Sequence, residues 1–138
     1  YRPHRVKHIE NINTGERTQI EPQPLRTLPL KPANVEVIRQ ALVGVNKEGT
    51  SARAFAGVEY TSGGKTGTAQ VYSLKGEKYV AHKIDERLRD HALFVAFAPA
   101  DDPKLAVAVL VENGGFGSSA AAPIARAIFD AYLVKPAP

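Results

Sequence analysis

The sequence predicts an α+β fold in which an antiparallel sheet is flanked by helices. Two apolar runs, 92–98 and 105–111, have the length and the β-branched and aromatic content of buried strands, and a turn rich in Pro and Asp separates them. Apolar residues recur at helical spacing before these runs, over 34–49, and after them, over 119–133. Strands grouped between helices, with no internal repeat, are typical of helices that cover one antiparallel sheet.

The composition is that of a folded domain and excludes several classes of function. Of the 138 residues, 43% are hydrophobic, which is enough to build a core. The 18 basic and 14 acidic residues leave a net charge of +4, and the basic residues are scattered, so we expect no nucleic-acid partner. Because Cys is absent, disulfides and thiolate zinc sites are excluded. No apolar run approaches the length of a membrane span.

The chain is expected to be a piece of a longer protein, since it contains no Met and begins at Tyr1 with residues unlike a signal peptide. Residues 1–33 are predicted to form an extended arm or linker within the domain, because five prolines interrupt them, although a short strand around 5–9 would fit. Residues 34–138 are predicted to be the C-terminal part of the domain.

The predicted elements of that part follow in order. Asn34 can cap a helix. This helix is expected to lie on the core through its apolar face, which consists of Val35, Ile38, Leu42 and Val45. After the Gly63-Gly64 break, residues 65–72 favour a strand, and residues 73–90 are charged and indicate a long exposed loop. The hairpin follows. In the closing helix, Pro123 lies in the first turn and the expected core face is Ile124, Ile128 and Tyr132 or Leu133.

The segment Gly64-Lys65-Thr66-Gly67-Thr68 carries the clearest chemical signal, and two enzyme classes use strings like it. The consensus of a phosphate-binding loop, G-x-x-x-x-G-K-[ST], matches this chain at Gly64, Lys65 and Thr66, but the chain has Glu59 at the position of the first consensus Gly. Such a loop must also lead into a helix, whereas the residues after Thr66 favour a strand. The other interpretation is the Lys-Thr-Gly strand of penicillin-interacting serine enzymes. On a strand, Lys65 and Gly67 project to one side and Thr66 and Thr68 to the other, and a substrate can be laid alongside the backbone.

Several further strings extend this likeness along the chain. The strings that carry it are, in chain order, Lys65 to Val71, His82-Lys83-Ile84, Glu86 to His91, the Ala98-Pro99 hairpin and Glu112-Asn113-Gly114-Gly115. With them, residues 34–134 resemble the penicillin-binding protein 2 family of the rod-shape elongation machinery. The resemblance implies the C-terminal part of the penicillin-binding transpeptidase fold, which serine β-lactamases share.

The resemblance also implies a chemistry. Members of this family are D,D-transpeptidases that cross-link peptidoglycan stem peptides through an acyl-serine, and β-lactams acylate the same serine. By resemblance, Lys65 supplies positive charge and a proton-relay contact, and the Thr66 and Thr68 hydroxyls hold the carboxylate of the substrate or drug. Gly67 lies between them in the substrate-binding strand. The Thr68 backbone N–H would be one oxyanion donor. No cofactor is implied.

The family also requires the motifs S-x-x-K and S-x-N, which precede Lys-Thr-Gly in the chain. No S-x-N occurs here, and the literal match Ser62-Gly63-Gly64-Lys65 is treated as coincidence, since two glycines spoil the helix that presents such a serine. The expected partners are therefore the N-terminal portion of the same protein, which carries both motifs, the stem peptide and β-lactams. A glycosyltransferase and scaffold proteins of the elongation complex are further expected partners, at the periplasmic face of the bacterial inner membrane.

Alternatives remain open at this point. A serine β-lactamase or D,D-carboxypeptidase shares the Lys-Thr-Gly strand, a catalytically silent module could keep the fold, and the string alone could be a polar edge strand. The loop 73–90 could border the active-site cleft or simply carry solvated charges. His82 and His91 lie nine residues apart in charged sequence, a spacing that matches no compact helical pair of metal ligands, so we expect no metal site.

Overall fold

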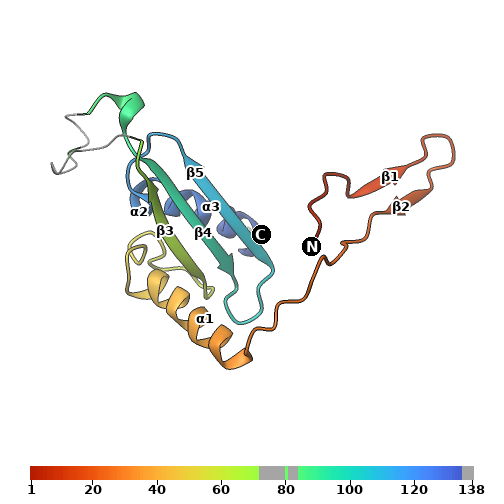
Figure 1. The fold of residues 1–138 in the computed structure, drawn as a ribbon, viewed down its shortest axis with the longest axis horizontal. Coiled ribbons are helices and arrows are strands. Elements are labelled where there is room, and N and C mark those ends of the chain that lie inside the picture. Colours follow the sequence, from red (N-terminus) through yellow and green to blue (C-terminus); the bar gives the residue numbers. More distant parts are fainter. Residues whose placement is uncertain (72–79, 81–83, 135–138) are drawn as a thin grey trace. The chain divides into compact units, whose positions relative to one another are not determined.

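The computed structural model describes residues 1–71, 80 and 84–134. The chain divides into two compact units, residues 1–32 and 33–138, and the second unit contains the sheet and the helices (Figure 1). None of the described helices is both long enough and apolar enough to cross a membrane.

The first unit contains a small hairpin. Strands β1 (His8–Glu10) and β2 (Arg17–Gln19) pair antiparallel, and Arg17 Nε lies 2.7 Å from Glu10 Oε2 across them. Gly15, with φ of 70°, and Asn11, whose Oδ1 accepts the backbone N–H of Asn13 at 3.0 Å, form the turn. For residues 1–33 an extended arm with a possible short strand around 5–9 was predicted; β1 overlaps that strand, and the pairing with β2 through an Asn and Gly turn was not predicted.

The second unit is built on a three-stranded antiparallel sheet with the order β3-β4-β5 (Figure 1). The strands are β3 (Gly63–Ala69), β4 (His91–Ala98) and β5 (Leu105–Val111), so the predicted strand and hairpin are confirmed. However, β3 begins at Gly63-Gly64, where the sequence analysis placed a break. A Cβ on Gly63 would lie 2.6 Å from the Phe97 ring, and one on Gly64 would lie 2.6 Å from the Phe94 ring. Glycine is needed there because rings from β4 lie against the strand.

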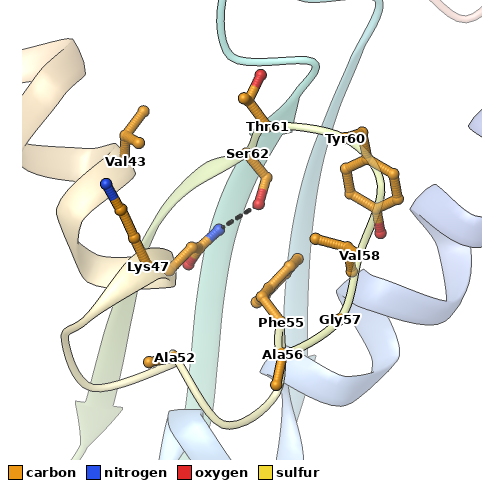
Figure 2. A pocket seen from close by; sticks show the side chains of 11 residues that line it. Val43, Lys47, Ala52, Phe55, Ala56, Gly57, Val58, Tyr60, Thr61 and Ser62 are labelled. Atoms are coloured by element: carbon orange, nitrogen blue, oxygen red, sulfur yellow. Dashed lines mark hydrogen bonds between the residues drawn. The ribbon is translucent and has the colours of Figure 1, made fainter.

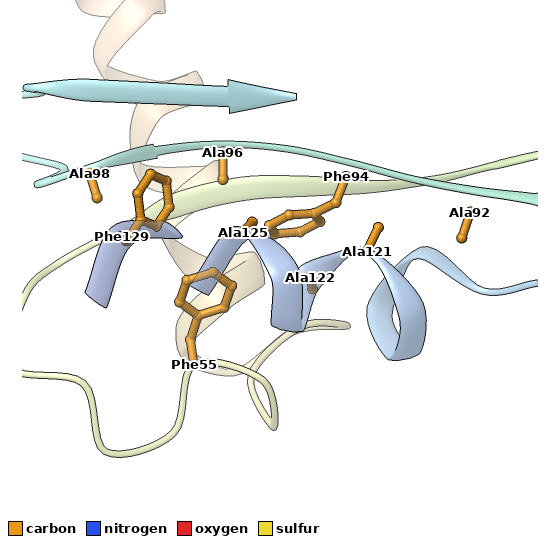
Figure 3. Packing of buried hydrophobic residues seen from close by; sticks show 9 residues of the cluster. All are labelled: Phe55, Ala92, Phe94, Ala96, Ala98, Ala121, Ala122, Ala125 and Phe129. Atoms are coloured by element: carbon orange, nitrogen blue, oxygen red, sulfur yellow. The ribbon is translucent and has the colours of Figure 1, made fainter. Parts of the chain in front are cut away.

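Two helices cover one face of the sheet, α2 (Gly117–Ala120) and α3 (Ala122–Leu133). Figure 3 shows that Phe129 and Ala125 of α3 lie against alternate residues of β4. Most of the predicted core face of this helix was wrong, because Ile124 and Ile128 are 44% and 41% exposed; of that face, Leu133 packs against the core. The helix instead buries Ala122, Ala125 and Phe129, and the two small side chains let it approach the sheet closely. The core contains these residues: Phe55, Ala92, Phe94, Ala96, Ala98, Ala121, Ala122, Ala125 and Phe129.

Helix α1 (Pro32–Lys47) forms where the sequence predicted a helix, but only the C-terminal half of the predicted core face is covered. Val35 and Ile38 of the expected core face are 46% and 60% exposed, whereas Leu42 and Val45 are half-buried and Asn46 is buried. Arg39 holds the helix in place, since its Nη1 donates to the Ala100 carbonyl at 2.7 Å while its Nη2 bonds Glu36. That hydrogen bond from Arg39 lowers the pKa of Glu36 to about 2.

The segment between α1 and β3 is attached to α3 by polar contacts. Arg126 Nη1 donates to the Ala56 carbonyl at 2.8 Å, and its Nε lies 3.1 Å from Asp130 Oδ2. The Tyr60 hydroxyl donates to Asp130 Oδ1 at 2.7 Å. Burial and this hydrogen bond raise the pKa of Tyr60 well above its ordinary value.

A matched pair of glycine substitutions tests the packing of β3 in the intact protein. Gly64→Ala should lower the free energy of unfolding by about 1–3 kcal/mol, because the new Cβ meets the Phe94 ring and the Val95 carbonyl. Gly44→Ala, in α1, should instead raise it by about 0.5–1 kcal/mol, since the nearest atom is a flexible Glu48 oxygen at 3.9 Å. Urea denaturation measures both, and equal effects of the two changes would contradict the packing.

The Tyr60 contact predicts a pH dependence. The folded protein keeps the Tyr60 proton at pH values where an unfolded tyrosine, with a pKa of about 10, loses it. The stability from Tyr60 is therefore fully present below about pH 10 and falls as pH rises further. Tyr60→Phe should lower the free energy of unfolding by about 1 kcal/mol at neutral pH, and by less at about pH 11. Urea denaturation of wild type and Tyr60→Phe at both pH values measures this difference, with Tyr132→Phe, at an exposed tyrosine, as the control. A difference in the free energy of unfolding that is as large at about pH 11 as at neutral pH would contradict the prediction.

Candidate active site

The Lys-Thr-Gly segment lies on β3, at one end of the strand order. Among the described residues only β4 pairs with β3, so its other edge is unpaired. The register pairs Lys65 with Val95, Thr66 with Phe94 and Thr68 with Ala92. Because opposed residues share a face, Thr66 and Thr68 project to the helix-covered side and Lys65 to the other, as the sequence predicted. The segment thus combines an exposed cation, two hydroxyls and an open strand edge.

The side chain of Lys65 is exposed, and its Nζ donates to the Thr66 carbonyl at 2.8 Å. The face from which it projects is apolar, and no described helix covers it. Val95 of β4 is 53% exposed there and Leu110 of β5 is 57% exposed. Lys65 therefore stands at the boundary between an uncovered apolar sheet face and an open backbone edge.

Thr66 is half-buried and has a side-chain partner. Its Oγ1 lies 3.2 Å from Oγ1 of Thr50, which belongs to the turn after α1, sixteen residues earlier. Sequence reasoning missed Thr50, because a lone Thr in a turn carries no signal that its hydroxyl meets another on a distant strand.

Gly67 lies where three backbones meet. A Cβ on Gly67 would be 3.3 Å from the Leu93 side chain. From the other side, α2 begins so close to the strands that a Cβ on Gly117 would be 2.2 Å from the Leu93 carbonyl oxygen and 2.8 Å from that of Gly67. Gly117 therefore allows the backbone of α2 to lie against β3 and β4 at this point, whereas a Cβ on Gly67 would make a tight contact with the Leu93 side chain.

Ser62 precedes β3 and belongs to a buried polar network. It is 5% exposed and its Oγ accepts a hydrogen bond of 2.9 Å from Asn46 Nδ2. Figure 2 shows this bond beside a pocket of about 340 Å³ between the end of α1 and the segment 52–62. Residues three apart on an extended strand project to opposite faces, so Ser62 and Lys65 do not form a serine–lysine pair.

Of the charged segment 73–90, the structure describes residue 80 and residues 84–90. It contains a short 3-10 helix, η2 (Glu86–Leu88), and Asn113 Nδ2 donates to the carbonyls of Arg87 and Arg89 at 3.1 and 2.9 Å. The Asn113 backbone N–H donates to His91 Nδ1 at 2.9 Å, so that ring nitrogen carries no proton. Among the described residues there is no group of three metal-ligating side chains, and His82 lies outside them. A role of the loop 73–90 at a cleft stays a prediction.

Comparison with known proteins gives a consistent result. Residues 1–130 match the penicillin binding protein transpeptidase domain family. The peptidoglycan D,D-transpeptidase MrdA of Haemophilus influenzae is 55% identical over 86 residues, which are 62% of this chain and 13% of that protein. MrdA of Escherichia coli K12 is 47% identical over 102 residues, 72% of this chain and 16% of that protein. The chain therefore spans a small part of the length of these relatives.

Solved structures show the same fold. Penicillin-binding protein 2 of Pseudomonas aeruginosa, in complex with WCK 5153, matches with a TM-score of 0.68 and 39% identity, over 84% of this chain and 23% of that one. Penicillin-binding protein 2 of Helicobacter pylori, in complex with MreC, matches with a TM-score of 0.61 and 29% identity, over 88% of this chain and 21% of that one. A ceftriaxone acyl-enzyme of penicillin-binding protein A from Mycobacterium tuberculosis matches with a TM-score of 0.68 and 30% identity, over 96% of this chain and 28% of that one.

The predicted α+β class and the resemblance drawn from the sequence are thus confirmed. The edge strand with Lys65-Thr66-Gly67-Thr68, the antiparallel sheet and the helices on one of its faces occur in a chain whose relatives include MrdA proteins. This chain belongs to the penicillin-binding protein transpeptidase domain family and is similar to part of the transpeptidase domain of its penicillin-binding protein 2 (MrdA) members.

Proposed function

We propose that this chain forms the Lys-Thr-Gly side of the active site of a serine D,D-transpeptidase, which cross-links peptidoglycan stem peptides through an acyl-enzyme. The observation that carries the proposal is the position of Lys65-Thr66-Gly67-Thr68 on a strand whose outer edge no described strand pairs with. A stem peptide is an extended chain, and such an edge can bind it as an added strand through backbone hydrogen bonds.

The side chains along this edge fit a ligand with a carboxylate end. Thr66 and Thr68 carry hydroxyls that can donate to a carboxylate. Lys65, one residue from Thr66 and three residues from Thr68 in the sequence, adds the positive charge of its ammonium. In the proposed reaction the Lys65 ammonium also contacts the proton relay around the nucleophile. Its exposure favours such a role, because it can reach a group that comes from outside this chain.

The reaction also needs a nucleophile and an oxyanion site. The serine of S-x-x-K and the S-x-N motif would come from the N-terminal portion of the same protein, since the chain spans only 13% of the Haemophilus relative. That serine attacks the D-Ala-D-Ala carbonyl and expels the terminal D-Ala. The acyl group then passes to an amine of a neighbouring stem peptide. The backbone N–H of Thr68 would be one donor to the oxyanion.

Uncovered apolar surface supports this division of the site between two parts of one protein. Val95 and Leu110 on the sheet, and Ile38 on α1, are each more than half exposed. Exposed apolar surface of this kind favours burial against further protein. A nucleophile-bearing portion that covers the sheet face would stand on the side from which Lys65 projects.

The proposal extends to inhibitors, partners and place of action. β-Lactams would acylate the serine, as the related Mycobacterium protein forms a ceftriaxone acyl-enzyme. Scaffold proteins would be partners, as the related Helicobacter protein forms a complex with MreC, and a glycosyltransferase of the elongation complex would be another. The protein would act at the periplasmic face of the bacterial inner membrane, anchored outside this chain.

Replacing Lys65 tests the proposal in the intact protein. Lys65→Ala should slow acylation by benzylpenicillin by about tenfold or more, because the ammonium is lost from the reacting groups. The free energy of unfolding should change by less than about 0.5 kcal/mol, since the side chain is exposed.

A stopped-flow measurement of acylation, with urea denaturation beside it, makes this comparison. Lys104→Ala is the matched control, because Lys104 is also exposed and pairs with Asp102 in the β4–β5 turn. Acylation kinetics that Lys65→Ala leaves unchanged would remove Lys65 from the active site and overturn the proposal.

A further inference from the structure

The turn after α1 places a second hydroxyl beside the proposed carboxylate-binding strand. Oγ1 of Thr50 is 3.2 Å from Oγ1 of Thr66, and either atom can be the donor. Thr50 is itself exposed, so no packing of its side chain into the core explains its position. The contact joins two segments sixteen residues apart in the sequence.

The backbone on both sides of Thr50 is hydrogen-bonded, and on the preceding side the Gly49 N–H donates to the Gly44 carbonyl at 2.9 Å. Ser51 is 1% exposed, and its hydroxyl donates to Asn46 Oδ1 at 2.6 Å. The Ser51 N–H bonds the Val45 carbonyl at 3.2 Å. Asn46 in turn donates to Ser62, directly before β3. A Cβ on Gly64 would lie 3.1 Å from Asn46 Oδ1, so the carboxamide lies against the strand itself. The turn that carries Thr50 and the strand that carries Thr66 are thus tied to one buried carboxamide.

The chemistry of the hydroxyls then sets the direction of the hydrogen bonds. An ionised carboxylate only accepts, so a Thr66 hydroxyl that binds it must donate its single proton to it. Thr66 Oγ1 can then only accept from Thr50, and Thr50 must be the donor. Donation from Thr50 polarises the Thr66 O–H and strengthens its bond to the carboxylate.

The surroundings of Thr50 favour a negative charge. Thr50 lines a hollow of about 420 Å³ together with Arg53, Ser118 and Ser119, among other residues. Of the residues that line this hollow, Arg53 alone is charged. Its guanidinium and the hydroxyls are all hydrogen-bond donors, and no lining side chain is acidic.

We propose that Thr50 is a positioning residue: its hydroxyl donates to Thr66 Oγ1 and so aims the Thr66 proton at the carboxylate of the stem peptide or β-lactam. This inference rests on the proposed function and adds to it a residue outside the Lys-Thr-Gly strand. Thr50 acts through Thr66, without touching the reacting carbonyl.

The test uses the intact protein and two probes, benzylpenicillin and its methyl ester, in which the carboxylate is blocked. Thr50→Val should lower the second-order rate constant of acylation by benzylpenicillin by about three- to tenfold, which is the effect of one hydrogen bond. The rate constant of acylation by the methyl ester should be the same for Thr50→Val and wild type. Thr50→Ala should behave in the same way, and Thr50→Ser, which keeps the hydroxyl, should stay close to wild type. Thr66→Val should show the same selectivity for the carboxylate, and Thr50→Val/Thr66→Val should be no slower than Thr66→Val.

Thr61→Val is the matched control, because it removes a Thr hydroxyl that bonds Asp101 at 2.8 Å, outside β3. Its rate constants for both probes should equal those of wild type. If Thr66→Val is selective but Thr50→Val and Thr50→Ala are not, the inference falls while the proposed function stands. Equal slowing of both probes by Thr50→Val, or additive effects in the double variant, also overturns it. If neither Thr66→Val nor Lys65→Ala affects acylation, the proposed function itself fails.

Discussion

The close backbone packing of β3 is the constraint on which the rest of the site depends. Side chains larger than hydrogen at Gly63 and Gly64 would meet the rings of Phe97 and Phe94, and one at Gly117 would meet the backbone of Gly67. Glycine at these positions lets β4 on one side and α2 on the other hold the strand without occupying its outer edge. The Lys-Thr-Gly segment is therefore rigid along its backbone and open where a ligand strand would pair.

The segment between α1 and β3 supports the same strand from the helix-covered side. It is attached to α3 through Arg126 and Tyr60, to the start of β3 through Asn46 and Ser62, and to Thr66 through Thr50. A site whose polar groups are held by packed elements and by a supporting shell loses little entropy on binding. The charge on the Lys-Thr-Gly strand itself, in contrast, is the exposed ammonium of Lys65, which donates to the Thr66 carbonyl and can meet groups from another part of the protein.

Much of this arrangement could be predicted from the sequence. Length and residue type were enough for the hairpin, and periodicity was enough for the existence of α1 and α3. The predicted core faces of both helices were wrong in part, because large aliphatic residues such as Ile38 and Ile128 were assumed to be buried. In α3 the small residues Ala122 and Ala125 face the sheet, and in α1 Arg39 and Asn46 make the contacts. Thr50 was missed because hydrogen bonds between distant hydroxyls leave no periodic pattern.

The central claim is that this chain supplies one side of the active site and not its nucleophile. Labelling with a fluorescent penicillin, followed by peptide mapping of the intact protein, tests it most directly. We expect the adduct to map to a serine outside the 138 residues of this chain. An adduct on Ser62 would contradict it, because Ser62 is buried, bonded to Asn46 and on the opposite face from Lys65.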